Sequence, residues 1–348
     1  MRFRMALRFF TTLKGLSNSS YSVLQMKAII HKKYGPPSVA YLAEIDKPQP
    51  KDDELLVKVY ASTVNRTDSG FRSAVYVVSR FWSGLFRPKY QVLGCEFAGI
   101  VENIGKNVSG FAIGDQVFGY NDKSFGGHAE YLTINCNGAV ATAPENISLY
   151  EAAALTEGAH YALNIIRSAK VKKGQDVLVY GATGAIGSSA VQLLNCLGVN
   201  LTAVCNTKNV ALLKSLGVGN VIDYQQSDFT KLGHTFDFVF DAVGKSSFGE
   251  CRPILKAQGI YISTEFGKYG QNLFFAIKHA IFKDKKKVLF PIPPDLSKQD
   301  VLYLKELAEN QKFRPVIDSY RKMEEIVDVY EYVDSGKKTG NVILKIVD

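Results

Sequence analysis

The most informative segment of the chain is Val177-Leu178-Val179-Tyr180-Gly181-Ala182-Thr183-Gly184-Ala185-Ile186-Gly187. An apolar run typical of a buried strand leads into glycines spaced G-x-x-G-x-x-G, and a helical pattern follows. The first glycine permits a tight turn, small residues let the backbone approach a pyrophosphate, and Gly187 lets the helix pack close to the strand. Because a helix N-terminus attracts anions, we expect residues 181–187 to bind a dinucleotide cofactor.

Beyond this segment, short apolar runs alternate with helical ones. Strands are predicted at 201–204, 221–222, 238–240, 253–255 and 260–262, and helices at 185–197 and 210–216. Continuous apolar strands between amphipathic helices are typical of a parallel sheet covered on both faces. Upstream, Ser148 is expected to cap one long helix over 149–166. The sequence therefore predicts an α/β, doubly wound domain over residues 148–312.

The first part of the chain has a different pattern, with short predicted strands separated by turns. Strands are predicted at 26–30, 55–60, 99–102 and 116–119, separated by turn signals such as Gly35-Pro36-Pro37. The tail returns to strand-like segments at 315–317 and 341–347, around a helix over 323–333. We expect residues 26–147 and 313–348 to form one mostly antiparallel β domain.

Charge and cysteine content exclude several classes of protein. The net charge is +9, but Arg2, Arg4, Arg8 and Lys14 contribute four of these charges, which leaves +5 for the rest. Without a basic stripe to neutralise phosphates, we expect no nucleic-acid partner. The five cysteines include no CxxC pair, so neither a disulfide framework nor a zinc finger is encoded. The longest apolar run, 273–282, is shorter than the roughly 20 residues of a transmembrane helix, so no transmembrane segment is expected.

The first 25 residues are basic, rich in Ser and Thr, and free of acids, as in organellar transit peptides. The alternative, which we favour, is that Met26 is the natural start and residues 1–25 are a poorly ordered extension. The expected location is cytoplasmic, with organellar import if residues 1–25 are a genuine leader.

Cofactor choice depends on the residues after the second strand of the doubly wound domain. Proteins that use NAD(H) carry an acid there, which binds the ribose hydroxyls. Here the strand is followed by Asn206, Thr207 and Lys208. The first two could donate hydrogen bonds to a 2′-phosphate and Lys208 could neutralise it, so NADPH is the predicted cofactor. Alternatively, Lys208 is a solvated lysine at a helix start.

The motifs and their order resemble the medium-chain dehydrogenase/reductase superfamily, in its zinc-free quinone oxidoreductase, or zeta-crystallin-like, branch. The resemblance covers nearly everything after Met26. It is carried by residues 26–28, 64–68, 92–99, 114–119, 127–131, 152–155, the turn at Gly181, and 240–244. It implies a GroES-like substrate domain built from both chain ends, a Rossmann domain, a cleft between them and a homodimer.

The resemblance also bears on metal binding and on the reaction. Zinc-dependent relatives hold a catalytic metal with cysteine and histidine side chains, and the corresponding positions here resemble Asn65, Cys95 and the vicinity of Gly158. This set predicts no metal site. Without a metal to activate an alcohol, the expected substrate is a quinone or an α,β-unsaturated carbonyl, reduced by hydride transfer from NADPH.

Four further residues are assigned by the resemblance. Asn65 is expected near the nicotinamide and Tyr76 in the cleft, as catalytic residues, although either could be structural. Tyr224 is expected against the 2′-phosphate end of the cofactor. Val243 ends the fourth strand, on the side of the sheet where ligands bind.

Some features depart from the family or leave alternatives open. Many relatives have a threonine against the nicotinamide where His160 and Tyr161 stand here, and no proton donor is assigned. The aromatic and basic segment 79–88 predicts a lid, a peripheral membrane contact or a packed loop. Two other functions stay open: an alcohol dehydrogenase with another metal arrangement, and a non-catalytic NADPH-binding sensor or partner protein.

Overall fold

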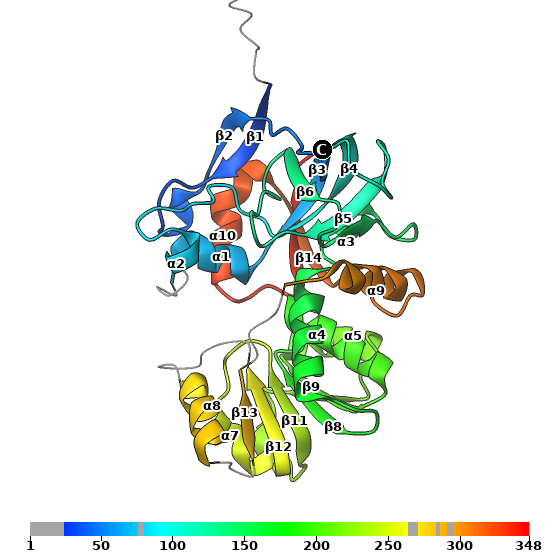
Figure 1. Ribbon diagram of the computed structural model, residues 1–348. Coiled ribbons are helices and arrows are strands. Elements are labelled where there is room, and N and C mark those ends of the chain that lie inside the picture. Colours follow the sequence, from blue (N-terminus) through cyan, green and yellow to red (C-terminus); the bar gives the residue numbers. More distant parts are fainter. Residues whose placement is uncertain (1–23, 76–79, 264–270, 283–285, 291–294, 348) are drawn as a thin grey trace, which may run out of the picture.

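The computed structural model describes residues 24–75, 80–263, 271–282, 286–290 and 295–347. The expectations for residues 1–23 and for Tyr76 therefore lie outside the described residues. Two sheets of different kinds occupy the two halves of the molecule (Figure 1). One is mostly antiparallel and the other is entirely parallel, which confirms the predicted fold class.

The mostly antiparallel half contains both ends of the described chain. Its main sheet has the strand order β14-β15-β3-β4-β5-β7, with β6 paired to β3, and β1 and β2 form a separate antiparallel pair. The strands are β1 (Gln25–Ile30), β2 (Tyr41–Asp46), β3 (Glu54–Val64), β4 (Glu96–Ile104), β5 (Gln116–Tyr120), β6 (Tyr131–Asn135), β7 (Val140–Thr142), β14 (Ile317–Lys322) and β15 (Asn341–Lys345). The helices are α1 (Arg66–Ser73), α2 (Arg80–Ser83) and α10 (Ile326–Asp334), with 3₁₀ turns at Pro37–Val39 and Met323–Glu325. The tail thus returns to the first half, as its strand-like pattern predicts.

The other half is a doubly wound domain whose parallel sheet has the order β10-β9-β8-β11-β12-β13. Its strands are β8 (Asp176–Tyr180), β9 (Asn200–Cys205), β10 (Asn220–Asp223), β11 (Phe236–Asp241), β12 (Leu255–Ser263) and β13 (Lys287–Leu289). Its helices are α4 (Glu157–Ala169), α5 (Ala185–Leu197), α6 (Val210–Ser215), α7 (Phe248–Cys251) and α8 (Gln271–Phe282). Two further helices contact the antiparallel sheet: α3 (Leu149–Ala152) lies against β3, β4 and β5, and α9 (Lys298–Glu309) lies against β7. Three 3₁₀ turns lie at Thr207–Asn209, Phe229–Lys231 and Arg252–Ile254.

Both faces of the parallel sheet are buried. Val177 and Val179 of β8 belong to a core shared with the apolar residues of α4 and α5. Leu178, which points the opposite way, packs in a second core with Phe248 of α7 and Phe275 of α8. This alternation explains why β8 reads as an uninterrupted apolar run.

The helix predicted over 149–166 is wrong in one respect, because the segment forms two helices. The α3 helix ends at Ala152 and α4 begins at Glu157. The backbone N–H groups of Thr156 and Glu157 both donate to the Glu96 carboxylate from β4, at 2.8 and 2.6 Å. A side chain from a distant strand therefore starts the second helix, and a local pattern cannot reveal that.

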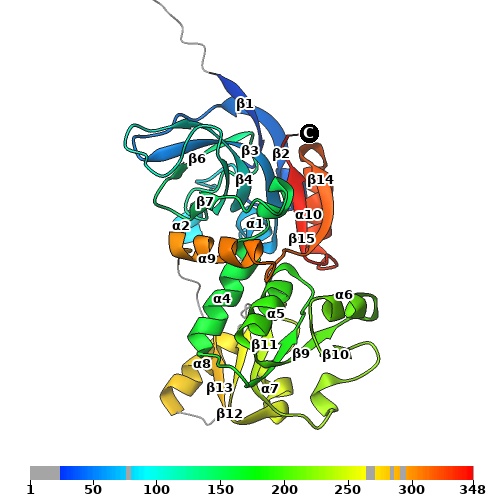
Figure 2. The same cartoon turned by 90° about the vertical axis from the view of Figure 1, so that its right-hand side faces the viewer.

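The two halves are joined near the C-terminus. The Gly340 N–H donates to the Thr183 carbonyl at 2.7 Å, and Gly184 and Gly340 form a parallel bridge. The α9 helix lies against β7, and the Lys305 ammonium donates to the Thr142 hydroxyl at 2.6 Å (Figure 2). The boundaries at 147/148 and 312/313 stay predictions.

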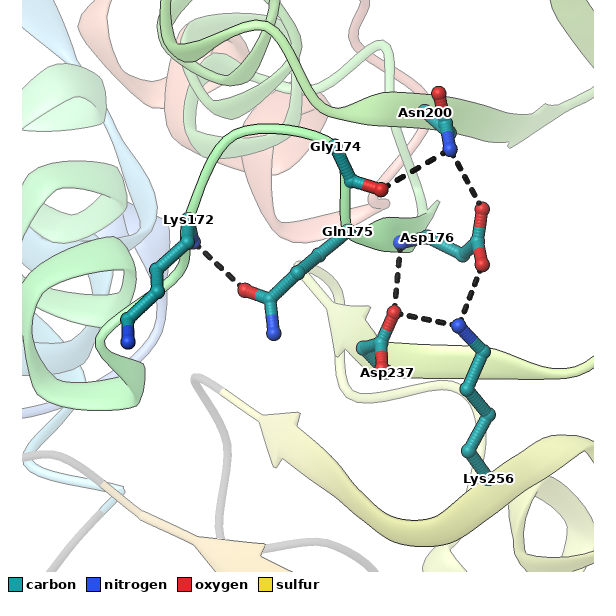
Figure 3. Close-up of polar contacts among 7 residues, drawn as sticks. All are labelled: Lys172, Gly174, Gln175, Asp176, Asn200, Asp237 and Lys256. Carbon is teal, nitrogen blue, oxygen red and sulfur yellow. Dashed lines mark hydrogen bonds and ion pairs between the residues drawn. The ribbon is translucent and has the colours of Figure 1, made fainter.

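A polar cluster fastens the amino-terminal edge of the parallel sheet (Figure 3). The Lys256 ammonium lies 2.5 Å from the Asp176 carboxylate and 2.7 Å from that of Asp237. Asn200 donates to Asp176 at 3.0 Å, so the cluster joins β8, β9, β11 and β12. The hydrogen bond from Lys256 is the main cause that lowers the pKa of Asp176.

We expect Lys256→Met to reduce the free energy of unfolding by roughly 1 kcal/mol at pH 7, because the cluster is half-exposed and water screens its charges. Since Asp176 has a lowered pKa in the folded state, its contribution is present above the unfolded pKa of about 3.9 and is lost below it. The difference between variant and wild type should therefore shrink as the pH falls below about 4 in urea titrations.

Lys172 is the matched control, because it is exposed at the same edge and contributes only its backbone N–H to the contacts in Figure 3. Lys172→Met should leave the unfolding free energy unchanged. An equal loss in both variants would contradict the role given to the cluster.

Candidate active site

A cavity of about 580 Å³ lies between the two halves of the molecule. The antiparallel half contributes Asn65, Thr67 and Lys338 to its wall, and the parallel half contributes Gly184 and Val243. The predicted glycine turn and the predicted residue Asn65 are thus brought to one cavity although they lie far apart in the sequence.

The glycine turn has the geometry that its sequence predicts. Gly181 has a φ of +74°, which favours glycine, and a Cβ there would lie 2.5 Å from the side chain of Val243. A Cβ on Gly187 would lie 2.1 Å from the Gly181 carbonyl oxygen, so only glycine lets α5 pack so close to the turn. Gly184 is the N-cap of α5 and supplies no side-chain cap, which leaves the helix N-terminus suited to a phosphate.

The other residues of the turn are distributed between the core and the cavity. Ala182 is fully buried, while Ala185 and Ile186 border the cavity at the start of α5. The Thr183 hydroxyl accepts a hydrogen bond at 3.3 Å from Asn209, whose amide also donates to Thr339 at 3.2 Å. These hydrogen bonds join the glycine turn to the loop after β9 and to the C-terminal segment.

The residues predicted to select NADPH follow the neighbouring strands β9 and β10. The Asn206 side-chain oxygen is buried without a hydrogen-bond partner, Lys208 is exposed, and Tyr224 is 49% exposed. An unsatisfied buried acceptor beside an exposed lysine and tyrosine fits a site that a polar ligand completes.

One residue of this region was missed by the sequence analysis. Asp223 ends β10, next to the end of β9, and its carboxylate accepts a 2.6 Å hydrogen bond from the Thr207 hydroxyl. Thr207 therefore does not present its hydroxyl freely, as the NADPH prediction assumes. Only the parallel pairing of β9 and β10 reveals this acid, which follows Thr207 by 16 residues in the chain.

A buried carboxylate organises the opposite wall of the cavity. Glu96, at the start of β4, is fully buried and accepts five hydrogen bonds. Its donors are the Thr63 hydroxyl, the Asn65 amide, the Thr156 N–H and hydroxyl, and the Glu157 N–H. Burial raises the pKa of Glu96, and these donors oppose that shift.

Asn65 stands at the centre of this wall. Its Nδ2 atom lies 3.1 Å from a carboxylate oxygen of Glu96 and 3.1 Å from one of Glu157, and it also donates to Thr63 at 3.0 Å. Its Oδ1 atom accepts from the Lys338 ammonium at 3.1 Å. Since acceptors fill one end of the amide and a cation the other, the orientation of Asn65 is fixed.

Glu157 and Lys338 were not predicted as site residues. Glu157 is 4% exposed, and burial, followed by the charges of Asp68 and Glu96, raises its pKa well above the ordinary value. Burial lowers the pKa of Lys338 to about 8, and it also donates to the Gly340 carbonyl at 2.6 Å. The only sequence signal that could have identified Glu157 is its charge beside the two small residues Gly158 and Ala159.

A second cavity of about 430 Å³ adjoins the first. The two share Thr67, Phe71 and Tyr161, and the second is walled mainly by aromatic rings, among them Tyr90 and Tyr120. Its other lining residues are Phe125, Asp122, Lys123 and Asp295, and an ion pair of 2.7 Å joins the last two.

His160 and Tyr161 have different roles in this bend. His160 is buried against the rings of Tyr120 and Tyr161, and burial lowers its pKa to about 4, so it is neutral at pH 7. Burial raises the pKa of Tyr161, which keeps its hydroxyl protonated. Of His160 and Tyr161, only Tyr161 borders the cavities.

The residues at the family's zinc position do not fit a zinc ion. Of Asn65, Cys95 and Gly158, only Cys95 has a side chain that zinc binds in proteins, and one thiolate cannot hold the ion. Among the described residues, no group of three histidine, cysteine or acidic side chains could hold a metal.

The remaining expectations concern surfaces. In the segment 79–88, Phe81 and Phe86 are 77% and 87% exposed, while Ser79 lies outside the described residues. In the part of the chain that the structure covers, no helix is both long and apolar enough to cross a membrane. The homodimer and the cytoplasmic location stay predictions.

Comparison with known proteins gives two family matches. Residues 51–145 match the alcohol dehydrogenase GroES-like domain, and residues 216–344 match a family described as zinc-binding dehydrogenase. The second match lies outside Asn65, Cys95 and Gly158, the residues at the family's zinc position.

Relatives align over nearly the whole chain. A 2-methylene-furan-3-one reductase of Solanum lycopersicum is 29% identical over 92% of this chain and 79% of its own. A chloroplastic quinone-oxidoreductase homolog of Spinacia oleracea is 29% identical, over 92% and 98%. The structure of the quinone oxidoreductase from Coxiella burnetii superposes with a TM-score of 0.82 at 27% identity, over 93% of this chain and 100% of that one. With two family matches, relatives aligned over 92% of the chain and this agreement in fold, the chain belongs to the medium-chain dehydrogenase/reductase superfamily, in its quinone oxidoreductase branch.

Proposed function

We propose that the protein is an NADPH-dependent, zinc-independent oxidoreductase that reduces quinones or α,β-unsaturated carbonyls by hydride transfer. The observation that carries this proposal is the cavity between the domains, where the glycine turn faces the polar wall around Asn65. The names of the relatives, which include quinone oxidoreductases and an alkenal/one oxidoreductase, agree with this substrate class.

The cofactor would be held by residues that the structure already prepares. The turn at 181–187 and the N-terminus of α5 fit a pyrophosphate, and the exposed Lys208 and Tyr224 would face a 2′-phosphate. The unpartnered oxygen of Asn206 is an acceptor, so it would take a hydrogen bond from a ribose hydroxyl. When bound, NADPH supplies the hydride. The amide of Asn65, whose orientation is fixed, would contact the nicotinamide and orient it in the cavity.

The acceptor would lie where the two cavities meet. The aromatic rings that line the second cavity favour a flat, conjugated molecule, because rings stack on such surfaces and exclude water. With no metal to polarise an alcohol, a compound that is already electrophilic is the better substrate.

We expect Lys208→Glu to weaken NADPH binding by roughly tenfold or more, because it replaces an attractive charge at the 2′-phosphate with a repulsive one. NADH lacks this phosphate, so its affinity should change much less. Fluorescence titration of both cofactors measures the two dissociation constants.

Lys214→Glu is the matched control, since Lys214 is also exposed and lies on the adjacent helix α6. It should leave both affinities unchanged. Equal weakening of NADPH and NADH by Lys208→Glu would contradict the cofactor assignment. A parallel titration of Asp223→Asn, which removes the acid beside Thr207, should leave NADPH binding intact or stronger.

For the reaction, we expect EDTA-treated protein to oxidise NADPH in the presence of a naphthoquinone, a conjugated alkenal or a vinyl ketone, and not with a saturated aldehyde. The conjugated acceptors offer a carbon that accepts hydride without metal activation. Absorbance at about 340 nm, where the reduced nicotinamide absorbs, follows the turnover.

Two outcomes would contradict the proposal. Activity with alcohols that depends on added zinc would favour an alcohol dehydrogenase. Tight NADPH binding without turnover of any acceptor would favour a non-catalytic sensor or partner protein.

A further inference from the structure

The buried wall of the cavity holds two neighbouring carboxyl groups in unequal surroundings. Glu96 and Glu157 both lie 3.1 Å from the same amide nitrogen of Asn65. Glu96 accepts five hydrogen bonds, whereas Glu157 accepts two, from Asn65 and from the Thr67 hydroxyl. Since hydrogen bonds stabilise the ionised form, a proton shared by this pair resides on Glu157.

A path of hydroxyl groups leads from Glu157 to the cavities. The Thr67 hydroxyl lies 2.5 Å from Oε1 of Glu157 and 3.5 Å from the hydroxyl of Tyr161. Thr67 and Tyr161 border both cavities, and Glu157 borders the first. The second distance is long, and catalytic hydrogen bonds often shorten only when a ligand fills the site. The heavy atoms allow each hydroxyl to donate toward the cavity.

We propose that Glu157, Thr67 and Tyr161 form a proton relay that protonates the carbonyl oxygen of the acceptor. The proposal rests on the proposed function, and it supplies the proton donor that the sequence does not identify. Tyr161 is the catalytic residue, because its hydroxyl ends the chain that runs from Glu157 through Thr67 and its side chain borders both cavities, while Thr67 and Glu157 act through it.

Bound NADPH would supply the hydride to a carbon of the quinone or conjugated carbonyl, and the π electrons would move onto the carbonyl oxygen. That oxygen forms a bond to the Tyr161 proton, Tyr161 regains a proton from Thr67, and Thr67 regains one from Glu157. The acceptor has then gained a hydride and a proton, and Glu157 is left as a carboxylate that solvent reprotonates after the product leaves.

The surroundings of Glu157 suit both of its protonation states. The Lys338 ammonium on Asn65 offers a positive charge to the carboxylate, whereas the nearby acids favour the protonated form. The neutral His160 does not compete as an acid at pH 7. The titratable and charged groups that face Glu157 are Asp68 on α1, Cys95 and Glu96 at β4, Tyr120 on β5, Tyr161 on α4, and Lys338 before β15.

The first test uses the protein without cofactor. Infrared difference spectra at pH 7 should show the C=O stretch of a protonated carboxyl group, and Glu157→Gln should abolish it. Glu96→Gln is the matched control, because it alters the neighbouring carboxylate and retains an oxygen for the N–H groups at the start of α4. This variant should keep the band. Loss of the band in Glu96→Gln alone, or its absence from the wild type, would overturn the assignment.

The second test measures turnover. Tyr161→Phe and Thr67→Val should lower kcat by about a hundredfold, the usual contribution of a positioned acid, with little change in KM. Thr67→Ser keeps the hydroxyl and should restore most of the rate. The wild-type kcat should fall at high pH and show a solvent deuterium isotope effect, and Glu157→Gln should lose this pH dependence.

The outcomes separate the relay from the function on which it rests. If the wild type reduces conjugated acceptors and both Tyr161→Phe and Thr67→Val retain its rate, the relay is wrong and the proposed function stands. If the wild type reduces none of them, the proposed function fails and the relay fails with it. Unchanged NADPH binding by the variants shows that they are folded.

Discussion

The site depends on one buried interaction, the Glu96 carboxylate with its five donors. Two of these donors are the backbone N–H groups of Thr156 and Glu157, so a side chain of the antiparallel sheet begins a helix of the parallel domain. Two others are the side chains of Thr63 and Asn65, which end β3 and precede α1. Because a buried charge without such partners would cost several kcal/mol, the position of α4 relative to β3 and β4 follows from satisfying this group.

The same constraint explains the chemistry of the neighbouring acid. The donors that Glu96 uses are no longer available to Glu157, which shares only the Asn65 amide with it. Two adjacent acids in an apolar setting separate their pKa values, one staying ionised and the other holding a proton. Glu96, whose carboxylate has a structural role, thereby leaves Glu157 protonated as a proton source, and the Asn65 amide contacts both side chains.

How much of this structure can be predicted from the sequence depends on how far apart in the chain the interacting residues lie. The glycine turn is local: a strand, Gly181 and Gly187 lie within one segment, so its geometry is readable from the sequence. The broken helix at 153–156 and the acid beside Thr207 depend on contacts from β4 and β10. Asn65 was predicted through family resemblance, but its partner Lys338 lies 273 residues away and carries no motif. The site residues that sequence patterns miss are thus the ones whose contacts depend on strand order or on partners far away in the chain.

The C-terminal segment shows how the cofactor site and the polar wall are mechanically connected. Lys338 donates to Asn65, while Gly340, two residues on, donates its N–H to Thr183 in the glycine turn. Gly340 has a φ of +72°, and a Cβ there would lie 2.1 Å from the Val316 carbonyl oxygen, so only glycine allows this close passage. Lys338, Thr339 and Gly340 therefore connect the polar wall around Asn65 with the glycine turn, so one short segment holds both sides of the cavity.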